Sequence, residues 1–91
     1  MAIQKNKSFA VSKDVLFQEV SGETVLLDLA SESYFGLDEV GTRIWTLLNE
    51  DKTAVEMVDV LLEEYEVERE TLEGDVRDLL TALIEAGLLE Q

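Results

Sequence analysis

The chain has 91 residues, enough for one domain with a modest core and too few for the two lobes that most catalytic clefts need. It contains neither cysteine nor histidine, which excludes thiolate nucleophiles, zinc-finger ligand sets and histidine-based acid–base catalysis. The formal net charge of −14 opposes contact with nucleic acid and with anionic membrane surfaces.

The N-terminal stretch is polar and carries three of the seven basic side chains. It predicts a flexible tail at residues 1–13, followed by a single domain at residues 14–91. The tail lacks the apolar segment of a signal peptide, and nothing in the chain approaches the roughly 20 apolar residues that span a bilayer. The expected location is the cytoplasm.

Three segments near the start of the domain have the β-branched and aromatic composition of strands. Residues 15–20 and 24–29 flank a glycine-containing turn and predict a hairpin. Residues 33–37 predict a third strand, in which Phe35 and Leu37 share one face.

Two helices are expected next. Asp38 is a good N-cap for a helix over residues 39–49. Residues 53–56 fit a capping box, which predicts a second helix that ends near Tyr65. Its expected buried side chains are Val55, Val58, Leu61 and Leu62.

A third helix begins within residues 68–72 and ends at Gly87, a natural residue after a helix C-terminus. Its apolar side chains are Leu72, Val76, Leu79, Leu80, Leu83 and Ile84. Leu88 and Leu89 then fold back as a short apolar end. The predicted fold class is α+β: a three-stranded antiparallel sheet followed by three helices, in a winged-helix-like arrangement.

Carboxylate pairs are the candidates for chemistry. Asp75 with Asp78, or Glu63 with Glu64, could hold a cation or act as acid and base, but solvated helix faces are the more ordinary explanation. The sequence has no calcium-loop pattern, and its five glycines are too scattered to cradle a phosphate. It therefore predicts no enzyme, no metal and no cofactor.

A helix-turn-helix interpretation of the second and third helices has to be weighed. The recognition helix would carry five acidic side chains against Arg69 and Arg77, so phosphates would repel it. A winged-helix DNA-binding or transcriptional module is kept as the alternative hypothesis.

Two features favour peptide binding instead. The strand at residues 33–37 ends the strand series and contains Gly36, which lets another backbone approach its edge. Gly36 could equally serve only to relieve crowding before the helix. The apolar arc of the third helix is wider than the roughly 100° that one core contact requires. The surplus could meet a ligand, cover Leu88 and Leu89, or form a dimer contact, so a monomer and a weak dimer both stay open.

Several segments of the sequence resemble the PqqD family. Together they cover roughly residues 14–90. The resemblance is carried by GETVLLDL at residues 22–29, SYFGLDEVGTRIW at residues 33–45, Asp75-Val76, Leu79-Leu80, and EAGLL at residues 85–89.

The resemblance implies a RiPP recognition element, a small domain that binds the leader segment of a ribosomally made precursor peptide and presents it to modifying enzymes. In such domains the leader lies as an added antiparallel strand on the third strand, beside the third helix. The binding residues that the resemblance implies are Ser33, Tyr34, Phe35, Gly36, Leu37, Asp75, Val76, Leu79 and Leu83.

The implied partners are the leader peptide and a modifying enzyme. This enzyme is a radical-SAM protein in pyrroloquinoline quinone synthesis, and a leader protease with a cyclase in lasso-peptide maturation. The strand-to-helix segment is slightly closer to lasso-type members, and the acidity of the chain would suit a leader that carries Lys or Arg.

Overall fold

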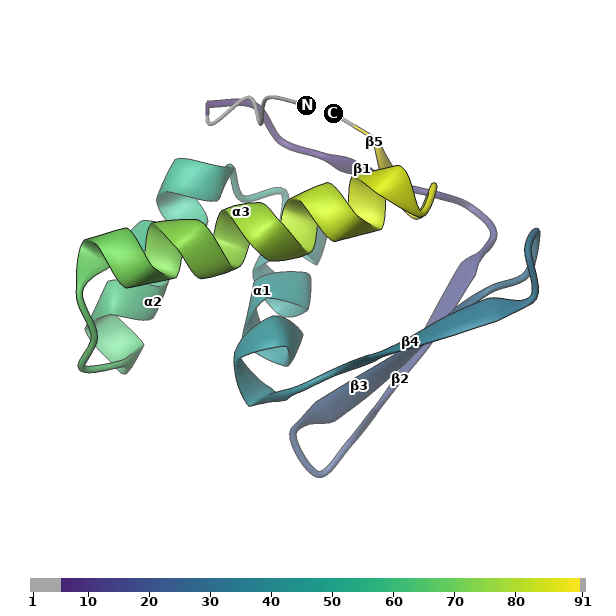
Figure 1. Cartoon of the computed structure of the whole chain (residues 1–91), viewed down its shortest axis with the longest axis horizontal. Coiled ribbons are helices and arrows are strands. Elements are labelled where there is room, and N and C mark those ends of the chain that lie inside the picture. The colour runs from purple at the N-terminus through teal and green to yellow at the C-terminus, as the bar shows by residue number, and fades with distance from the viewer. Residues whose placement is uncertain (1–5, 91) are drawn as a thin grey trace.

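A small antiparallel sheet comes first in the chain and three helices follow it, as the sequence predicts. Figure 1 shows the computed structural model, which describes residues 6–90. Its elements are β1 (Ala10–Val11), β2 (Val15–Val20), β3 (Glu23–Asp28), β4 (Ser33–Leu37), α1 (Glu39–Asn49), α2 (Ala54–Glu64), α3 (Arg69–Glu85) and β5 (Leu89–Glu90). The predicted α+β class, with three strands before three helices, is confirmed.

The three-stranded sheet has the order β2-β3-β4, with both pairs antiparallel. A two-residue turn joins β2 to β3, and both of its residues, Ser21 and Gly22, have positive φ angles, of 55° and 82°. Two positive φ angles in a two-residue loop are typical of a type I′ turn, whose twist matches that of the strands. This turn fixes the register of the hairpin, in which Val20 pairs with Glu23.

One face of the sheet packs against the helices. Leu26 lies at its centre and is fully buried, and its cross-strand neighbours Phe17 and Phe35 share its face. The ring of Phe17 meets Trp45 of α1 edge-on, with 5.5 Å between the ring centroids. The helices complete the core with Ile44, Trp45, Leu47, Leu48, Met57, Val58, Leu61, Leu72, Val76, Leu80 and Leu83.

Local capping motifs set the helix ends. The Asp38 side chain accepts a hydrogen bond from the Gly41 N–H at 2.8 Å, and Thr53 with Glu56 forms the predicted capping box. Gly87, with a φ angle of 81°, follows Ala86, the C-cap residue of α3. The Leu88 N–H donates to the Leu83 carbonyl, which is the Schellman pattern. The predicted helix boundaries are confirmed to within a residue or two.

The buried face of α2 differs from the prediction at one position. Val55 was expected in the core but is 37% exposed, while Met57 is fully buried. The capping box places Val55 in the first turn on the solvent side. Met57 and Leu61 are spaced by four residues and share the face that meets the core.

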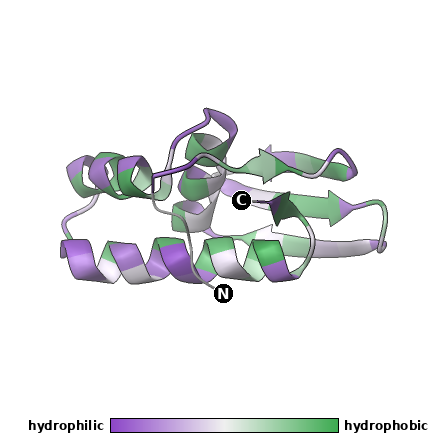
Figure 2. Ribbon diagram, turned by 90° about the horizontal axis from the view of Figure 1, so that it is seen from above, coloured by the Kyte–Doolittle hydropathy of each residue, from purple (hydrophilic) through white to green (hydrophobic). Residues whose placement is uncertain are grey.

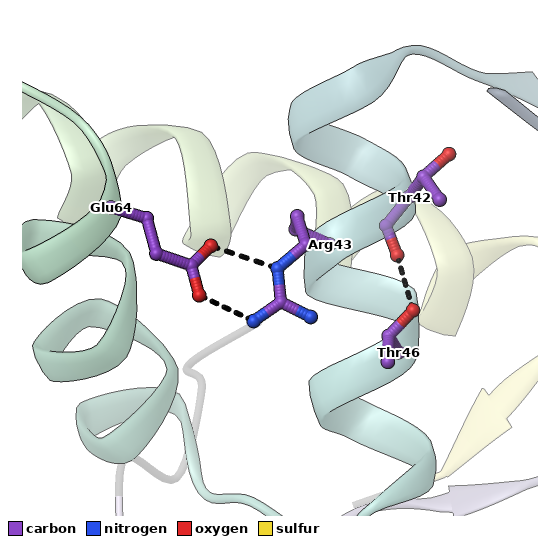
Figure 3. Close-up of polar contacts among 4 residues, drawn as sticks. All are labelled: Thr42, Arg43, Thr46 and Glu64. Atoms are coloured by element: carbon purple, nitrogen blue, oxygen red, sulfur yellow. Dashed lines mark hydrogen bonds and ion pairs between the residues drawn. The ribbon is translucent and has the colours of Figure 1, made fainter. Parts of the chain in front are cut away.

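An ion pair joins α1 to α2 (Figure 3). The Arg43 guanidinium binds both carboxylate oxygens of Glu64, with Nε–Oε1 at 2.8 Å and Nη2–Oε2 at 2.5 Å. The hydrogen bond from Arg43 lowers the pKa of Glu64, and the same bond raises the pKa of Arg43. On the adjoining turn of α1, the Thr46 hydroxyl donates to the Thr42 carbonyl at 3.0 Å.

The N-terminal part of the chain is more ordered than expected. Phe9 is buried, and β1 pairs with β5 through Ala10 with Glu90 and Val11 with Leu89 (Figure 1). Residues 9–11 of the tail that the sequence predicts at residues 1–13 are thus packed against the domain. Residues 1–5 of that tail lie outside the residues that the structure describes. The apolar end of the chain supplies the partner strand, a long-range pairing that local composition does not reveal. No helix within residues 6–90 is long and apolar enough to cross a membrane.

Candidate functional site

The three-stranded sheet has two outer edges, on β2 and on β4, and the free edge of β4 is the one that leads directly into α1. β3 pairs with one side of β4, and no strand of the described residues pairs with the other side. An unpaired strand edge offers a row of backbone donors and acceptors to another chain.

The hairpin register identifies which residues offer these groups. Val20 and Glu23 flank a two-residue turn and so form a hydrogen-bonded pair, and the Leu29 N–H bonds to the Asp14 carbonyl at 2.8 Å. Odd-numbered residues of β3 therefore bond to β2, and even-numbered ones bond to β4.

On β4 the same alternation continues. Ser33, Phe35 and Leu37 pair with even-numbered residues of β3 and use their backbone groups there. Tyr34 and Gly36 consequently direct their N–H and C=O groups toward the free edge. Of the five strand residues expected to bond to a guest backbone, two have the groups free to do so.

A groove of about 470 Å³ lies beside the end of β4, between the start of α1 and the middle of α3. It brings residues of the consecutive elements β4 and α1 together with residues of α3, which is distant in sequence. Its lining residues are Gly36, Leu37, Asp38, Val40, Gly41, Ile44, Asp75, Asp78 and Leu79.

The groove combines an apolar wall with acidic side chains. Val40 and Leu79 are half-buried and supply apolar surface. The polar contribution comes from the exposed carboxylates Asp38, Asp75 and Asp78. Within residues 6–90, no three acidic side chains converge closely enough to hold a metal ion. The groove is thus suited to an apolar side chain with a neighbouring cation.

Two glycines border the groove for different reasons. A Cβ atom at Gly41 would lie 3.2 Å from both Asp38 Oδ1 and the Leu37 Cβ atom, so any side chain there would push these neighbours back, and glycine allows α1 to start close to β4. A Cβ atom at Gly36 would meet nothing within 4 Å. The crowding considered for Gly36 is therefore absent.

The helix residues expected at the site divide into two groups. Asp75 and Leu79 line the groove beside Gly36 and Leu37. Val76 and Leu83 are each only 1% exposed and belong to the core, so the structure gives them no part in the groove. The apolar arc of α3 is wide because it also covers Leu88 and Leu89, which are buried at the end of the chain.

Sequence reasoning missed five lining residues. Asp78 was considered only in an acidic pair with Asp75 and not as a peptide-binding residue, although it lies one turn after Asp75 and next to Leu79. Asp38 was predicted only as the N-cap of α1, and Val40, Gly41 and Ile44 were not proposed for the site. The position of α1 directly after β4 was the available signal, since a helix that starts at a strand end brings its first turns to that edge.

The sheet face that points away from the helices is uncovered and apolar. Leu16, Val20, Val25 and Tyr34 lie on it and are between 49% and 74% exposed. Tyr34 belongs to this face and also to the free edge, so the two surfaces are continuous.

The chain matches the family model for coenzyme PQQ synthesis protein D over residues 23–89. Among solved structures, it is 49% identical to TbiB1 in complex with the TbiA(beta) leader peptide, with a TM-score of 0.83, over 88% of this chain and 93% of that one. It is 28% identical to a lasso peptide synthetase B1 complexed with the leader peptide, with a TM-score of 0.84, over 92% and 99% of the two chains. A search of curated proteins found no significant match. The family model covers most of the chain, including β4, α1 and α3, and the chain therefore belongs to the PqqD family.

Proposed function

We propose that this domain binds the leader segment of a ribosomally synthesised precursor peptide as an added strand on β4. The observation that carries the proposal is the free edge at Tyr34 and Gly36, directly beside the groove between α1 and α3. Support also comes from TbiB1, which is 49% identical and whose structure is a complex with a leader peptide.

Backbone and side-chain contacts have different tasks in this binding mode. Tyr34 and Gly36 each offer one N–H and one C=O, so a guest strand gains up to four ladder hydrogen bonds. Each contributes a net of about 0.5–1.5 kcal/mol, independent of the guest's sequence. One apolar guest side chain buried in the groove adds about 1.5–3 kcal/mol. The ladder sets the register, and the groove selects the sequence.

The register also determines which guest side chains reach the groove. Guest residues opposite Phe35 and Leu37 point to the helix-facing side of the sheet, as Phe35 and Leu37 do. Guest residues opposite Tyr34 and Gly36 point to the uncovered outer face. A leader is therefore read through every second residue.

The outer sheet face is suited to receive the enzyme that modifies the precursor. It is apolar, it is uncovered in the described structure, and a leader on β4 would extend it by one strand. An enzyme docked there would contact the domain and the leader together. Tethering would raise the precursor's effective concentration at the enzyme, to the millimolar range for a short flexible linker. The domain thus acts by delivery and has no catalytic step of its own, in the cytoplasm where ribosomal peptides are made.

The DNA-binding alternative has no comparable support. α3 would be the recognition helix, and Figure 2 shows that its first half is mainly hydrophilic. The charged residues there are mostly acidic, including the exposed Glu70, Glu73, Asp75 and Asp78. Phosphates would be repelled from this surface.

The proposal is tested by fluorescence anisotropy with a labelled leader from the precursor encoded beside this chain, and with the TbiA(beta) leader as a second probe. A scrambled peptide of identical composition is the control. We expect saturable binding of a leader and none of the scrambled peptide. Equal binding of leader and scrambled peptide, or binding of neither leader, would overturn the proposal.

A further inference from the structure

We infer that the groove selects leaders carrying a lysine or arginine, whose cationic head lies between Asp75 and Asp78 of α3 and faces Asp38 at the start of α1. The inference rests on the proposed function and names the chemistry of the leader that the site prefers. It is carried by the charges that line the groove and by the lack of a structural reason for two of them.

The groove is acidic without internal compensation. All three of its ionisable lining residues are aspartates. The nearest cation on α3 is Arg77, which does not line the groove; its Nε lies 3.6 Å from Asp78 Oδ1, and both side chains are largely exposed. An exposed pair at that distance leaves most of the carboxylate's charge to solvent and to any incoming ligand.

Asp38 has a structural task, whereas the Asp75 side chain makes no hydrogen bond or ion pair in the described structure and Asp78 has only the exposed contact with Arg77. One oxygen of Asp38 caps α1 through the Gly41 N–H. Asp75 and Asp78 lie in the middle of α3, so the helix dipole does not favour them as it favours acids in the first turn. Like charges three residues apart on a helix lower its stability. This unfavourable pair is explained by a cationic ligand.

The carboxylates are arranged for an extended cation and not for a metal ion. In the part of the chain that the structure describes, no three acidic groups meet at one point. They border a groove whose wall includes Val40 and Leu79. A lysine or arginine can lay its aliphatic stem on such a wall while its charged head remains at the wet, acidic rim. A leader glutamate in the same place would face three negative charges.

The experiment uses the TbiA(beta) leader as the probe, with Lys and then Glu placed at each position in turn. Every second leader position faces the helices. At one or two of these positions, we expect the Lys peptide to bind about three- to tenfold more tightly than the Glu peptide. This is the range for one or two partly exposed ion pairs. In the double variant Asp75→Asn, Asp78→Asn, the Lys-to-Glu ratio should fall below about twofold at those positions.

The matched control is the double variant Glu70→Gln, Glu85→Gln, which removes the same two charges from α3 outside the groove. It should keep the full Lys-to-Glu ratio. A ratio that persists in the Asp75→Asn, Asp78→Asn variant, or that falls equally in both double variants, overturns the inference while leaving leader binding intact. Absence of binding by every TbiA(beta) peptide overturns this inference, and it overturns the proposed function as well if the leader encoded beside this chain also fails to bind.

Discussion

Replacing Gly36 with proline tests the strand-addition mechanism at a single backbone atom. The Gly36 N–H points to the free edge, so proline removes a donor that β3 does not use. Edge strands tolerate proline where the N–H side faces solvent, and the preceding Phe35 already has the extended backbone that proline favours. The free domain should therefore stay folded.

The expected loss of affinity follows from the missing donor. A ladder hydrogen bond contributes a net of about 0.5–1.5 kcal/mol, and a guest carbonyl left buried without a partner costs about 1–3 kcal/mol. The Gly36→Pro variant should therefore bind its leader roughly 5- to 150-fold more weakly, which corresponds to about 1–3 kcal/mol.

Gly36→Ala is the matched control because it keeps the N–H and adds a Cβ atom that meets nothing within 4 Å. Its Kd for the leader should stay within about twofold, as for a neutral surface change. Fluorescence anisotropy gives the Kd of each variant, and thermal melting followed by circular dichroism checks that both remain folded. Wild-type affinity in a folded Gly36→Pro variant would refute the assignment of Gly36 to the binding edge.

Three further predictions concern the groove, the core and the charge. Leu83→Ala should lower the free energy of unfolding by about 2–5 kcal/mol, because Leu83 is 1% exposed, whereas Leu79→Ala should mainly weaken leader binding, because Leu79 lines the groove. Urea melts measure the first effect and fluorescence anisotropy the second. A stable Leu83→Ala variant that binds the leader weakly would contradict the assignment of the two faces of α3. The Arg43→Gln, Glu64→Gln double-mutant cycle should give a coupling energy of about 0.2–1 kcal/mol at pH 7, because both side chains are about one-third exposed. The pKa of Glu64 is lowered in the folded chain, so this coupling should be complete above the ordinary value of 4.5 and be lost as the pH falls through the lower folded-state pKa. A coupling that does not weaken as the pH is lowered below 4.5 would be inconsistent with the ion pair. In a gel shift at low salt the domain should leave duplex DNA unshifted, and a retarded band would show that its acidity does not exclude phosphates.

Local signals were sufficient to predict β2, β3, β4 and the three helices. Asp38 and the Thr53–Glu56 capping box mark the starts of α1 and α2, and Gly87 marks the end of α3, because each acts on backbone groups within a few residues. β4 was predicted with its observed bounds, residues 33–37, since its composition and the turn before it are both local.

The long-range contacts could not be predicted in the same way. β1 pairs with β5 across nearly the whole chain, which no local pattern records. On α3, burial of Val76 and Leu83 depends on where α1, α2 and the C-terminal residues pack, so the hydrophobic arc alone did not reveal which edge faces the groove. Asp78 was missed because an acidic residue on a helix equally fits a solvated face, and only the packing of α3 beside β4 and α1 reveals that it lines the groove.

The most direct test of strand addition is amide hydrogen exchange on β4, measured by NMR with and without a saturating leader. The Tyr34 and Gly36 amides should exchange rapidly in the free domain and become protected in the complex, while Phe35 and Leu37, already bonded to β3, should be protected in both. If the Tyr34 and Gly36 amides still exchanged rapidly with the leader fully bound, the leader would not be a strand on β4.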